Sequence, residues 1–290
     1  MNSILFNLSG KIDPLLVDVI RIIKREADGL GIPFFVVGAT ARDILLEYCH
    51  AIKPQRMTMD LDVGIEVAGW EEFNLLTGVL VSNAGFKATR DTQKFLAGNF
   101  EIDIVPFGPI EAEVGTINWP PDNEMVINVM GFQEAYETAS LVRLSESPPL
   151  DVRVPTVPGM AVMKIISWRD KYPERSKDAE DLLFLMEHYA EAGNEDRLYG
   201  EDLAVMEAED FDPVQAGIRL LGRDMAALAS PKTIEEIRMI LADETGARDR
   251  YRLVEQMMKG RSVLRGSFDE LLEKVEKLKQ GLNEQIPFTE

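Results

Sequence analysis

The stretch DLDVGIEV at residues 60–67 places two aspartates at the start of an apolar run that is typical of a β-strand. Residues two apart in a strand face the same way, about 6.5–7 Å apart, so Asp60 and Asp62 are predicted to share one face. Buried together, the two carboxylates repel each other unless a cation binds them, and Mg²⁺ prefers such oxygen ligands. The alternative is a pair of solvated aspartates where a turn meets a strand, and the Asp-x-Asp pattern alone favours that alternative.

A third carboxylate is predicted on a later strand, EIDIV at residues 101–105. Its alternation places Ile102 and Ile104 on one face and Asp103 on the other. If the two strands are neighbours, Asp103 completes a site for two metal ions, which would align an attacking hydroxyl with a leaving pyrophosphate. Taken alone, Asp103 is better explained as a surface carboxylate on an edge strand.

An apolar strand and a glycine turn precede the two aspartates. PFFVVG at residues 33–38 predicts a strand buried on both faces, followed by a helix from Ala39 or Thr40 to about Tyr48. Gly38 lets a phosphate approach the backbone, the free N–H groups at the start of the helix bind anions, and Thr40 adds a hydroxyl. The alternative is an ordinary strand-to-helix turn capped by Thr40.

The order of these motifs resembles that of the DNA polymerase beta-like nucleotidyltransferase superfamily, with its glycine turn, paired Asp-x-Asp and later third carboxylate. Within it the sequence is most similar to the AbiEii-type nucleotidyltransferases of abortive-infection and toxin–antitoxin systems. Their patterns Gly-Gly-Thr-Ala and Arg-x-Ser-x-Asp-x-Asp are matched by GATA (38–41) and RMTMDLD (56–62). Their lysine-bearing helix and their Lys-Asp-x-x-Asp-Leu stretch are matched by MKIISWRDK (163–171) and KDAEDL (177–182). The sequence departs from the family pattern at Ala39, which replaces a second glycine, and at Thr58, where serine is common.

The resemblance implies an α+β protein with a nucleotidyltransferase domain at residues 1–155, a mixed sheet with flanking helices, and an all-helical C-terminal domain at residues 156–290. It implies Mg²⁺-dependent transfer of a nucleoside monophosphate from an NTP to a hydroxyl on RNA, a protein or a small molecule. It further implies a toxin role and an antitoxin partner. The rival hypothesis is a catalytically inactive nucleotidyltransferase fold that serves as an interaction module, although three retained, mutually repelling acids argue against decay.

The resemblance also implies a role for each matched residue. Asp60, Asp62 and Asp103 would hold Mg²⁺ or Mn²⁺, and Asp103 would help to deprotonate the attacking hydroxyl. The phosphates would be bound by the glycine turn and by residues of the flanking motifs. Lys164 would counter the charge of the pyrophosphate in catalysis, and Asp178 would position that lysine. The expected nucleotide-binding set is Gly38, Ala39, Thr40, Arg42, Arg56, Thr58, Lys177 and Asp178. The alternative for residues 177–181 is a solvated, charged helix face without a functional role. Judged from the residues alone, this alternative is about as well supported as the functional role.

Hydrophobic periodicity predicts the order of elements around these motifs. In the first half it predicts helices over residues 14–29 and 70–84 and short strands over 86–90, 94–97 and 100–105, with strands continuing to about residue 154. After Pro155 only helices are predicted, over residues 160–171, 177–190, 213–228 and 233–244, and from a capping box at Ser267 and Glu270 onward. Trp168 is predicted to lie in the core or at a domain interface.

Composition limits the function classes. The 50 acidic and 31 basic residues give a net charge of −19, which opposes sequence-blind binding of nucleic acid. Arginines and lysines gather at residues 248–265, where a solvated basic face is favoured over a contact for RNA or an acidic partner. The single cysteine, Cys49, excludes an internal disulfide and fits a reducing compartment. Without a basic leader, or an apolar run near the roughly 20 residues of a membrane helix, the chain is expected to be cytoplasmic.

Overall fold

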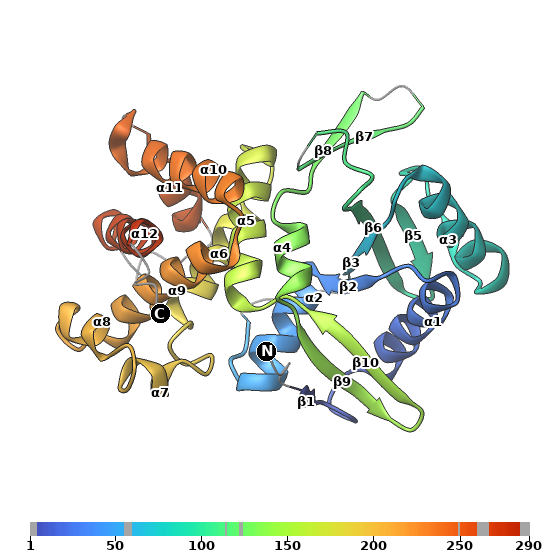
Figure 1. Cartoon of the computed structure of the whole chain (residues 1–290), viewed down its shortest axis with the longest axis horizontal. Helices are drawn as coiled ribbons and strands as arrows, with labels where there is room; N and C mark the ends of the chain where they lie inside the picture. Colours follow the sequence, from blue (N-terminus) through green and yellow to red (C-terminus); the bar gives the residue numbers. More distant parts are fainter. Residues whose placement is uncertain are drawn as a thin grey trace. The chain divides into compact units, whose positions relative to one another are not determined.

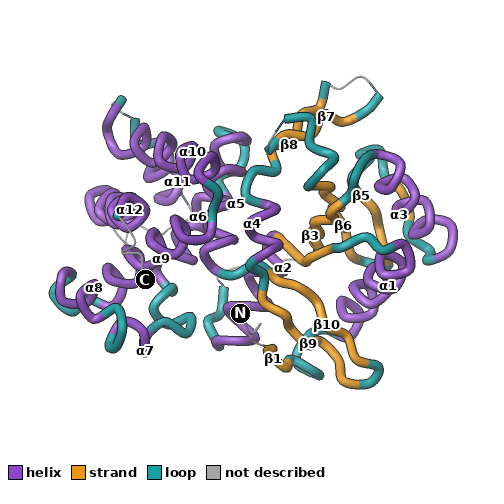
Figure 2. The backbone as a smooth tube through the Cα atoms, viewed as in Figure 1, coloured by secondary structure: helices purple, strands orange, loops and turns teal. Residues whose placement is uncertain are grey.

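The computed structural model describes residues 5–54, 60–113, 115–121, 124–248, 250–259 and 267–284. The chain divides into two compact units, Met1–Thr156 and Val157–Glu290 (Figure 1). The first is a mixed α/β unit and the second consists of helices (Figure 2). The α+β fold with a helical C-terminal region predicted from the sequence is confirmed.

A five-stranded sheet in the order β2-β3-β6-β5-β4 forms the centre of the first unit. Strands β3 and β6 are parallel, and the other neighbouring pairs are antiparallel. The strands are β2 (Phe34–Val37), β3 (Asp60–Glu66), β4 (Lys87–Ala88), β5 (Lys94–Ala97) and β6 (Phe100–Phe107). The β5 and β6 strands form a hairpin through Gly98 and Asn99, a two-residue connection that suits a tight hairpin turn.

Helices α1 (Pro14–Leu30) and α3 (Trp70–Asn83) pack beside each other at this sheet. The sequence predicted both, and α1 has the expected ends. The side chain of Asp13 accepts a hydrogen bond from the N–H of Leu15, Pro14 opens the helix, and Gly31 ends it with a left-handed φ of 69°. The residues of α1 buried against the unit recur at helical spacing: Val17, Val19, Ile20, Ile23 and Ala27.

The strand β2 leads directly into a helical segment made of α2 (Gly38–Arg42) and a π-helical turn, η1 (Asp43–Cys49). The sequence predicted one helix over this range, without the change of winding. A short helix that it did not predict, α4 (Phe132–Glu137), places Phe132 and Tyr136 against Phe35 of β2 at ring-centroid distances of 6.0 and 5.5 Å. The rings of Phe35 and Phe132 pack over Gly64 of β3, where a Cβ would lie 2.3 Å from the first ring and 3.3 Å from the second.

Two smaller sheets complete the first unit. One has the order β1-β9-β10, and the other pairs β7 with β8. The sequence predicted strands up to about residue 154 but not the N-terminal strand, which has only three residues. The strands are β1 (Leu5–Asn7), β7 (Thr116–Trp119), β8 (Met125–Asn128), β9 (Ser140–Glu146) and β10 (Pro149–Val154).

The second unit is built from eight helices in the part of the chain that the structure describes. They are α5 (Val157–Lys171), α6 (Lys177–Glu187), α7 (Glu195–Leu198), α8 (Leu203–Ala208), α9 (Pro213–Leu228), α10 (Pro231–Ala242), α11 (Arg252–Lys259) and α12 (Phe268–Asn283), with a π-helical turn, η2 (Asp243–Ala247). The predicted capping box at Ser267 and Glu270 is present at the start of α12. Trp168 is fully buried and donates a hydrogen bond to Gln256 at 2.8 Å, so its predicted place in a core is confirmed.

Helices α9 and α12 approach each other closely at two glycines. A Cβ on Gly281 would lie 1.9 Å from the carbonyl oxygen of Arg219, and one on Gly222 would lie 2.3 Å from that of Leu278. Such distances exclude any side chain at either position, so the two backbones are in direct contact there.

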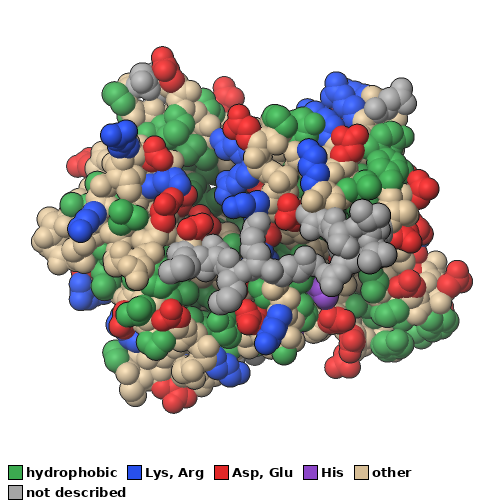
Figure 3. Space-filling view, turned by 180° about the vertical axis from the view of Figure 1, so that it is seen from behind, with side chains coloured by type: hydrophobic (Ala, Val, Ile, Leu, Met, Phe, Trp, Pro, Cys, Tyr) green, Lys and Arg blue, Asp and Glu red, His purple; other side chains and the backbone are tan. Residues whose placement is uncertain are grey.

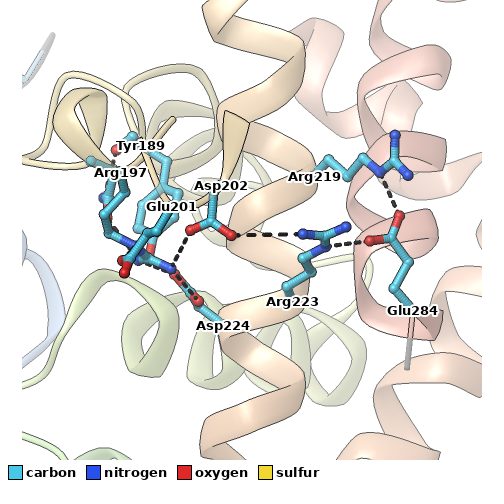
Figure 4. A network of polar contacts seen from close by, with 9 residues as sticks. Tyr189, Arg197, Glu201, Asp202, Arg219, Arg223, Asp224 and Glu284 are labelled. Atoms are coloured by element: carbon cyan, nitrogen blue, oxygen red, sulfur yellow. Dashed lines mark hydrogen bonds and ion pairs between the residues drawn. The ribbon is translucent and has the colours of Figure 1, made fainter. Parts of the chain in front are cut away.

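A chain of ion pairs includes Arg219, whose carbonyl makes this contact (Figure 4). Arg197 pairs with Asp224 at 2.8 Å and with Asp202 at 3.1 Å, and Arg223 joins Asp202 to Glu284, which also binds Arg219. The hydroxyl of Tyr189 donates to Asp224. The network therefore links the loops around α7 with α9 and the residue that follows α12.

Charged side chains of both signs are mixed over the face of the molecule drawn in Figure 3. In the basic stretch at residues 248–265, Arg252 binds the fully buried Glu244 and lies 4.8 Å from the ring centre of Tyr172. The predicted solvated basic face is therefore wrong at Arg252. Arg248 is exposed and pairs with Asp243, while Arg261 and Arg265 lie outside the described residues.

Candidate active site

The parallel pairing of β3 with β6 sets two of the predicted acids side by side. Asp62 is in register with Asp103, and Asp60 with Glu101. Both Asp62 and Asp103 are partly exposed. The alternate residues of the two strands, Leu61, Val63, Ile102 and Ile104, are fully buried on the opposite face. Burial of these apolar side chains therefore directs the two carboxylates to one face of the sheet.

Gly38 brings the glycine turn against the same carboxylates. The last residue of β2, Val37, pairs with Asp62, so the chain turns out of the sheet beside that aspartate. Gly38 has a left-handed φ of 66°, and a Cβ at this position would lie 1.9 Å from Oδ2 of Asp62. Glycine is thus required twice, by its backbone angle and by the close approach to the carboxylate.

The helical segment after Gly38 is tied to the start of β3. The buried Thr40 donates a hydrogen bond from Oγ1 to the carbonyl oxygen of Asp60 at 2.7 Å. Arg42 is also buried, and its guanidinium binds the carboxylate of its neighbour Asp43 through Nε at 2.8 Å and Nη2 at 2.6 Å. Ala39 lies between Gly38 and Thr40 in the first turn and is partly exposed.

Lys94 adjoins Asp103, and sequence reasoning did not single it out. It pairs with Asp103 across the β5–β6 hairpin, where its ammonium lies 3.8 Å from Oδ2 of Asp103 and 2.5 Å from Oε1 of Glu101. The hydrogen bond to Glu101 and the nearby acids raise the pKa of Lys94, although its partial burial opposes this. The Gly-Asn turn between the two strands is the signal that could have predicted this pairing.

Some of the predicted site residues are not gathered with Asp62 and Asp103. Asp60 is exposed at the start of β3, one pleat before Asp62. Across the described ranges of the chain, no three Asp, Glu, His or Cys side chains are gathered closely enough to enclose a metal ion. Arg56 and Thr58 lie outside the described residues. The metal-binding role of the three aspartates stays a prediction.

In the second unit the predicted lysine is held by two aspartates. The Lys164 ammonium of α5 lies 2.7 Å from Oδ1 of Asp178 and 2.7 Å from Oδ2 of Asp181, both on α6. The side chains of Asp178 and Asp181 are only 3% and 6% exposed, and Asp178 also accepts a hydrogen bond from Ser167 at 2.8 Å. The alternative of a solvated charged face is therefore wrong for these two acids. Lys177, in contrast, is exposed.

The two aspartates also set the charge state of Lys164. Burial by itself would lower the pKa of this ammonium, but the carboxylates of Asp178 and Asp181 outweigh it and raise the pKa above the ordinary 10.5. Lys164 is thus a protonated, immobilised cation at neutral pH.

A family comparison covers both units. The model described as "Nucleotidyl transferase AbiEii toxin, Type IV TA system" matches residues 21–274. The chain belongs to the AbiEii nucleotidyltransferase family. This AbiEii protein is accordingly a nucleotidyltransferase, and the family predicted from its motifs is confirmed. A comparison with curated proteins found no significant match.

Comparison with solved structures found other nucleotidyltransferases. The antibiotic-resistance factor ANT(2'')-Ia in solution is 14% identical, with 69% of this chain and 98% of that chain covered and a TM-score of 0.36. ANT(2'')-Ia in complex with adenylyl-2''-tobramycin is 16% identical, with 67% and 95% covered and a TM-score of 0.37. A CCA-adding enzyme in complex with ATP is 15% identical, with 95% and 82% covered and a TM-score of 0.34.

Proposed function

We propose that this AbiEii protein transfers a nucleoside monophosphate from an NTP to a hydroxyl of an acceptor in an Mg²⁺-dependent reaction, as the toxin of a toxin–antitoxin pair. The observation that carries the proposal is the register of Asp62 with Asp103, two carboxylates on one face of the sheet directly beside the Gly38 turn. Family membership supports the reaction class and the toxin role.

The donor set at the sheet suits a hard divalent cation. Asp62 and Asp103 offer carboxylate oxygens on one face, Asp60 offers a third from the same strand, and oxygen is the ligand that Mg²⁺ and Mn²⁺ prefer. When bound, such an ion neutralises charge on the triphosphate and on the leaving pyrophosphate. Asp103 would in addition accept the proton of the attacking hydroxyl, and the ammonium of Lys94 lies 3.8 Å from this carboxylate.

The turn at Gly38 would contribute the phosphate contacts. Its glycine leaves room for a phosphate next to the backbone, and the N–H groups of Gly38, Ala39 and Thr40 belong to the first turn of the helical segment, where partners within the helix are lacking. Arg42 would act indirectly, since its guanidinium already binds Asp43. Arg56 and Thr58 complete the proposed nucleotide-binding set on the strength of the family pattern.

Lys164, Asp178 and Lys177 complete the proposal from the second unit. A protonated lysine held in one position by two buried carboxylates fits the proposed role of countering the pyrophosphate charge, with Asp178 as the positioning residue. Lys177 is exposed and would contribute a mobile charge. The one cysteine fits the reducing conditions of the cytoplasm, where we propose that the protein acts. In the part of the chain that the structure describes, no helix is both long and apolar enough to cross a bilayer.

Binding of metal and nucleotide tests the site directly. With Mg²⁺ and each NTP in turn, we expect one nucleotide at about 100 times its Kd to stabilise the protein by about 2.7 kcal/mol, measured as a rise in Tm. The Asp60→Ala/Asp62→Ala variant should lose that rise and stay folded. The matched control is Asp18→Ala/Glu71→Ala, which removes two exposed acids of the same unit and should keep it.

Labelled transfer then identifies the acceptor. The same protein is incubated with Mg²⁺, the nucleotide labelled at its α-phosphate, and fractions of a cell lysate, and the labelled product is sought among RNA, protein and small molecules. Co-expression with the product of a neighbouring gene tests the antitoxin. A nucleotide-dependent rise in Tm that survives in Asp60→Ala/Asp62→Ala, or labelling at the wild-type rate by that variant, would refute the assignment.

A further inference from the structure

A pocket of about 410 Å³ opens in the first unit between helix α3 and the hairpin of β4 and β5. Phe73, Phe95 and Trp119, each 3–4% exposed, lie in its wall together with the more accessible Trp70. The rings of Trp70, Phe73 and Trp119 pack edge to face, with centroids 4.8–5.5 Å apart. They therefore form a rigid aromatic wall.

The pocket is separate from the candidate active site. In the β5–β6 pairing, Phe95 is in register with Ile102, whereas Lys94 is in register with Asp103. Side chains of neighbouring strand residues in register lie on the same face of a sheet. Phe95 and the pocket are thus on the face opposite the carboxylates of Asp62 and Asp103.

One carboxylate stands at the rim of this aromatic wall. Asp91 is the only charged side chain among the described residues that line the pocket. Its backbone is fixed by a turn, because its carbonyl accepts hydrogen bonds from the N–H of Lys94 at 2.9 Å and from the hydroxyl of Thr89 at 3.1 Å. The N–H of Asp91 in turn donates to Oγ1 of Thr89 at 3.1 Å.

We propose that this pocket is a binding site for a small organic cation, of the quaternary or alkylated ammonium class. The faces of tryptophan and phenylalanine rings attract a desolvated cation, and the carboxylate of Asp91 adds an opposite charge at the entrance. An anionic ligand is disfavoured, because the lining residues supply a negative charge and aromatic π-electrons. A ligand that is only apolar would leave the carboxylate without a function in binding.

Fluorescence titration of the full-length chain tests the proposal, since two of its three tryptophans line the pocket. The probes are choline and benzyltrimethylammonium, and the uncharged probe is 3,3-dimethylbutan-1-ol, which replaces the ammonium of choline by carbon. We expect both cations to give a saturable change below about 10 mM and the neutral alcohol to bind about tenfold more weakly.

Variants localise the binding. Asp91→Asn keeps the turn and removes the charge, and it should weaken the binding of both cations by about fivefold or more. Glu71→Gln removes an exposed charge from α3 outside the lining and should bind like the wild type. Trp70→Leu should weaken binding by about tenfold. Nucleotide transfer should proceed at the wild-type rate in Asp91→Asn.

Three results would each overturn the proposal. They are the absence of saturable binding by either cation, equal affinity for choline and its carbon analogue, and equal affinity of Asp91→Asn and Glu71→Gln. The second and third results would identify an apolar pocket that has no preference for charge. Because none of these measurements involves nucleotide or metal, they leave the proposed transferase reaction untouched.

Discussion

At Gly38 the backbone adopts a φ of 66°, and its Cα faces the carboxylate of Asp62. An alanine there meets two separate obstacles, the left-handed backbone angle and a Cβ 1.9 Å from Oδ2 of Asp62. The first costs about 1–2 kcal/mol. The second can be relieved only by moving the carboxylate, which belongs to the candidate metal site.

We therefore predict that Gly38→Ala abolishes the stabilisation by metal and nucleotide and lowers labelling by at least about 100-fold. The control is Gly10→Ala, because Gly10 has a φ of 76° but nothing within 4 Å of the added Cβ. Backbone strain should cost each variant about 1–2 kcal/mol of unfolding free energy, measured by urea denaturation, and Gly38→Ala should lose more because of its contact with Asp62. Only Gly38→Ala should lose activity. Equal activities in the two variants would remove Gly38 from the site.

Much of the site at the level of residues could be predicted, because strand alternation and the Asp-x-Asp spacing are local. That Asp62 and Asp103 lie side by side depends on which strands are neighbours in the sheet. Alternation within each strand does not specify that order. The role of Lys94 was missed for a related reason. Its partner Asp103 is nine positions away, and only the length of the hairpin turn determines which residue it faces.

Helices α5 and α6 are joined through the buried contact of Lys164 with Asp178 and Asp181. Removal of the lysine leaves two buried carboxylates without their cation, so Lys164→Ala is expected to lower the free energy of unfolding by about 3–5 kcal/mol at neutral pH. Among the described residues, Lys171 on the same helix pairs with the exposed Asp170 alone, at 3.2 Å. We expect Lys171→Ala to change stability by less than about 0.5 kcal/mol.

The same contact predicts that the stability contributed by Lys164 depends on pH in the alkaline range. The pKa of Lys164 is raised in the folded protein, so its contribution is complete below the ordinary pKa of 10.5 and declines as the pH rises through the higher native value. The stability difference between wild type and Lys164→Ala, from urea denaturation at several pH values, should therefore shrink above pH 10.5. A difference that stays constant or grows there would contradict the proposed charge state.

At the level of elements, long amphipathic helices were the most predictable and short elements the least. The helices α1, α9 and α12 each have a marked apolar periodicity and a side-chain cap at the N-terminus. The helix α4 has six residues and the strand β1 has three, lengths at which periodicity carries almost no signal. Their positions depend on packing against Phe35 and on pairing with β9, which are contacts between distant parts of the chain.

Across the whole molecule, each unit has an apolar core of its own. In the second unit Trp168, Leu221 and Leu278 are among the side chains with 0% exposure. We predict that residues 157–290 fold when expressed alone, with an unfolding free energy of about 5–15 kcal/mol. Trp168 is the only tryptophan in this range and reports on the core by fluorescence, alongside circular dichroism at helical wavelengths. A fragment that is unfolded or lacks a cooperative transition would show that the proposed domain division is wrong.

The glycine contact between α9 and α12 predicts that the two helices unfold together. With the carbonyl of Arg219 against Gly281, and that of Leu278 against Gly222, neither helix can unwind without exposing the backbone of the other. Amide protons of the two helices, although some sixty positions apart in the chain, should then exchange with deuterium in one cooperative step and with one common protection factor. The last helix of the described chain would be among its slowest to exchange, and would not fray like an ordinary terminal segment.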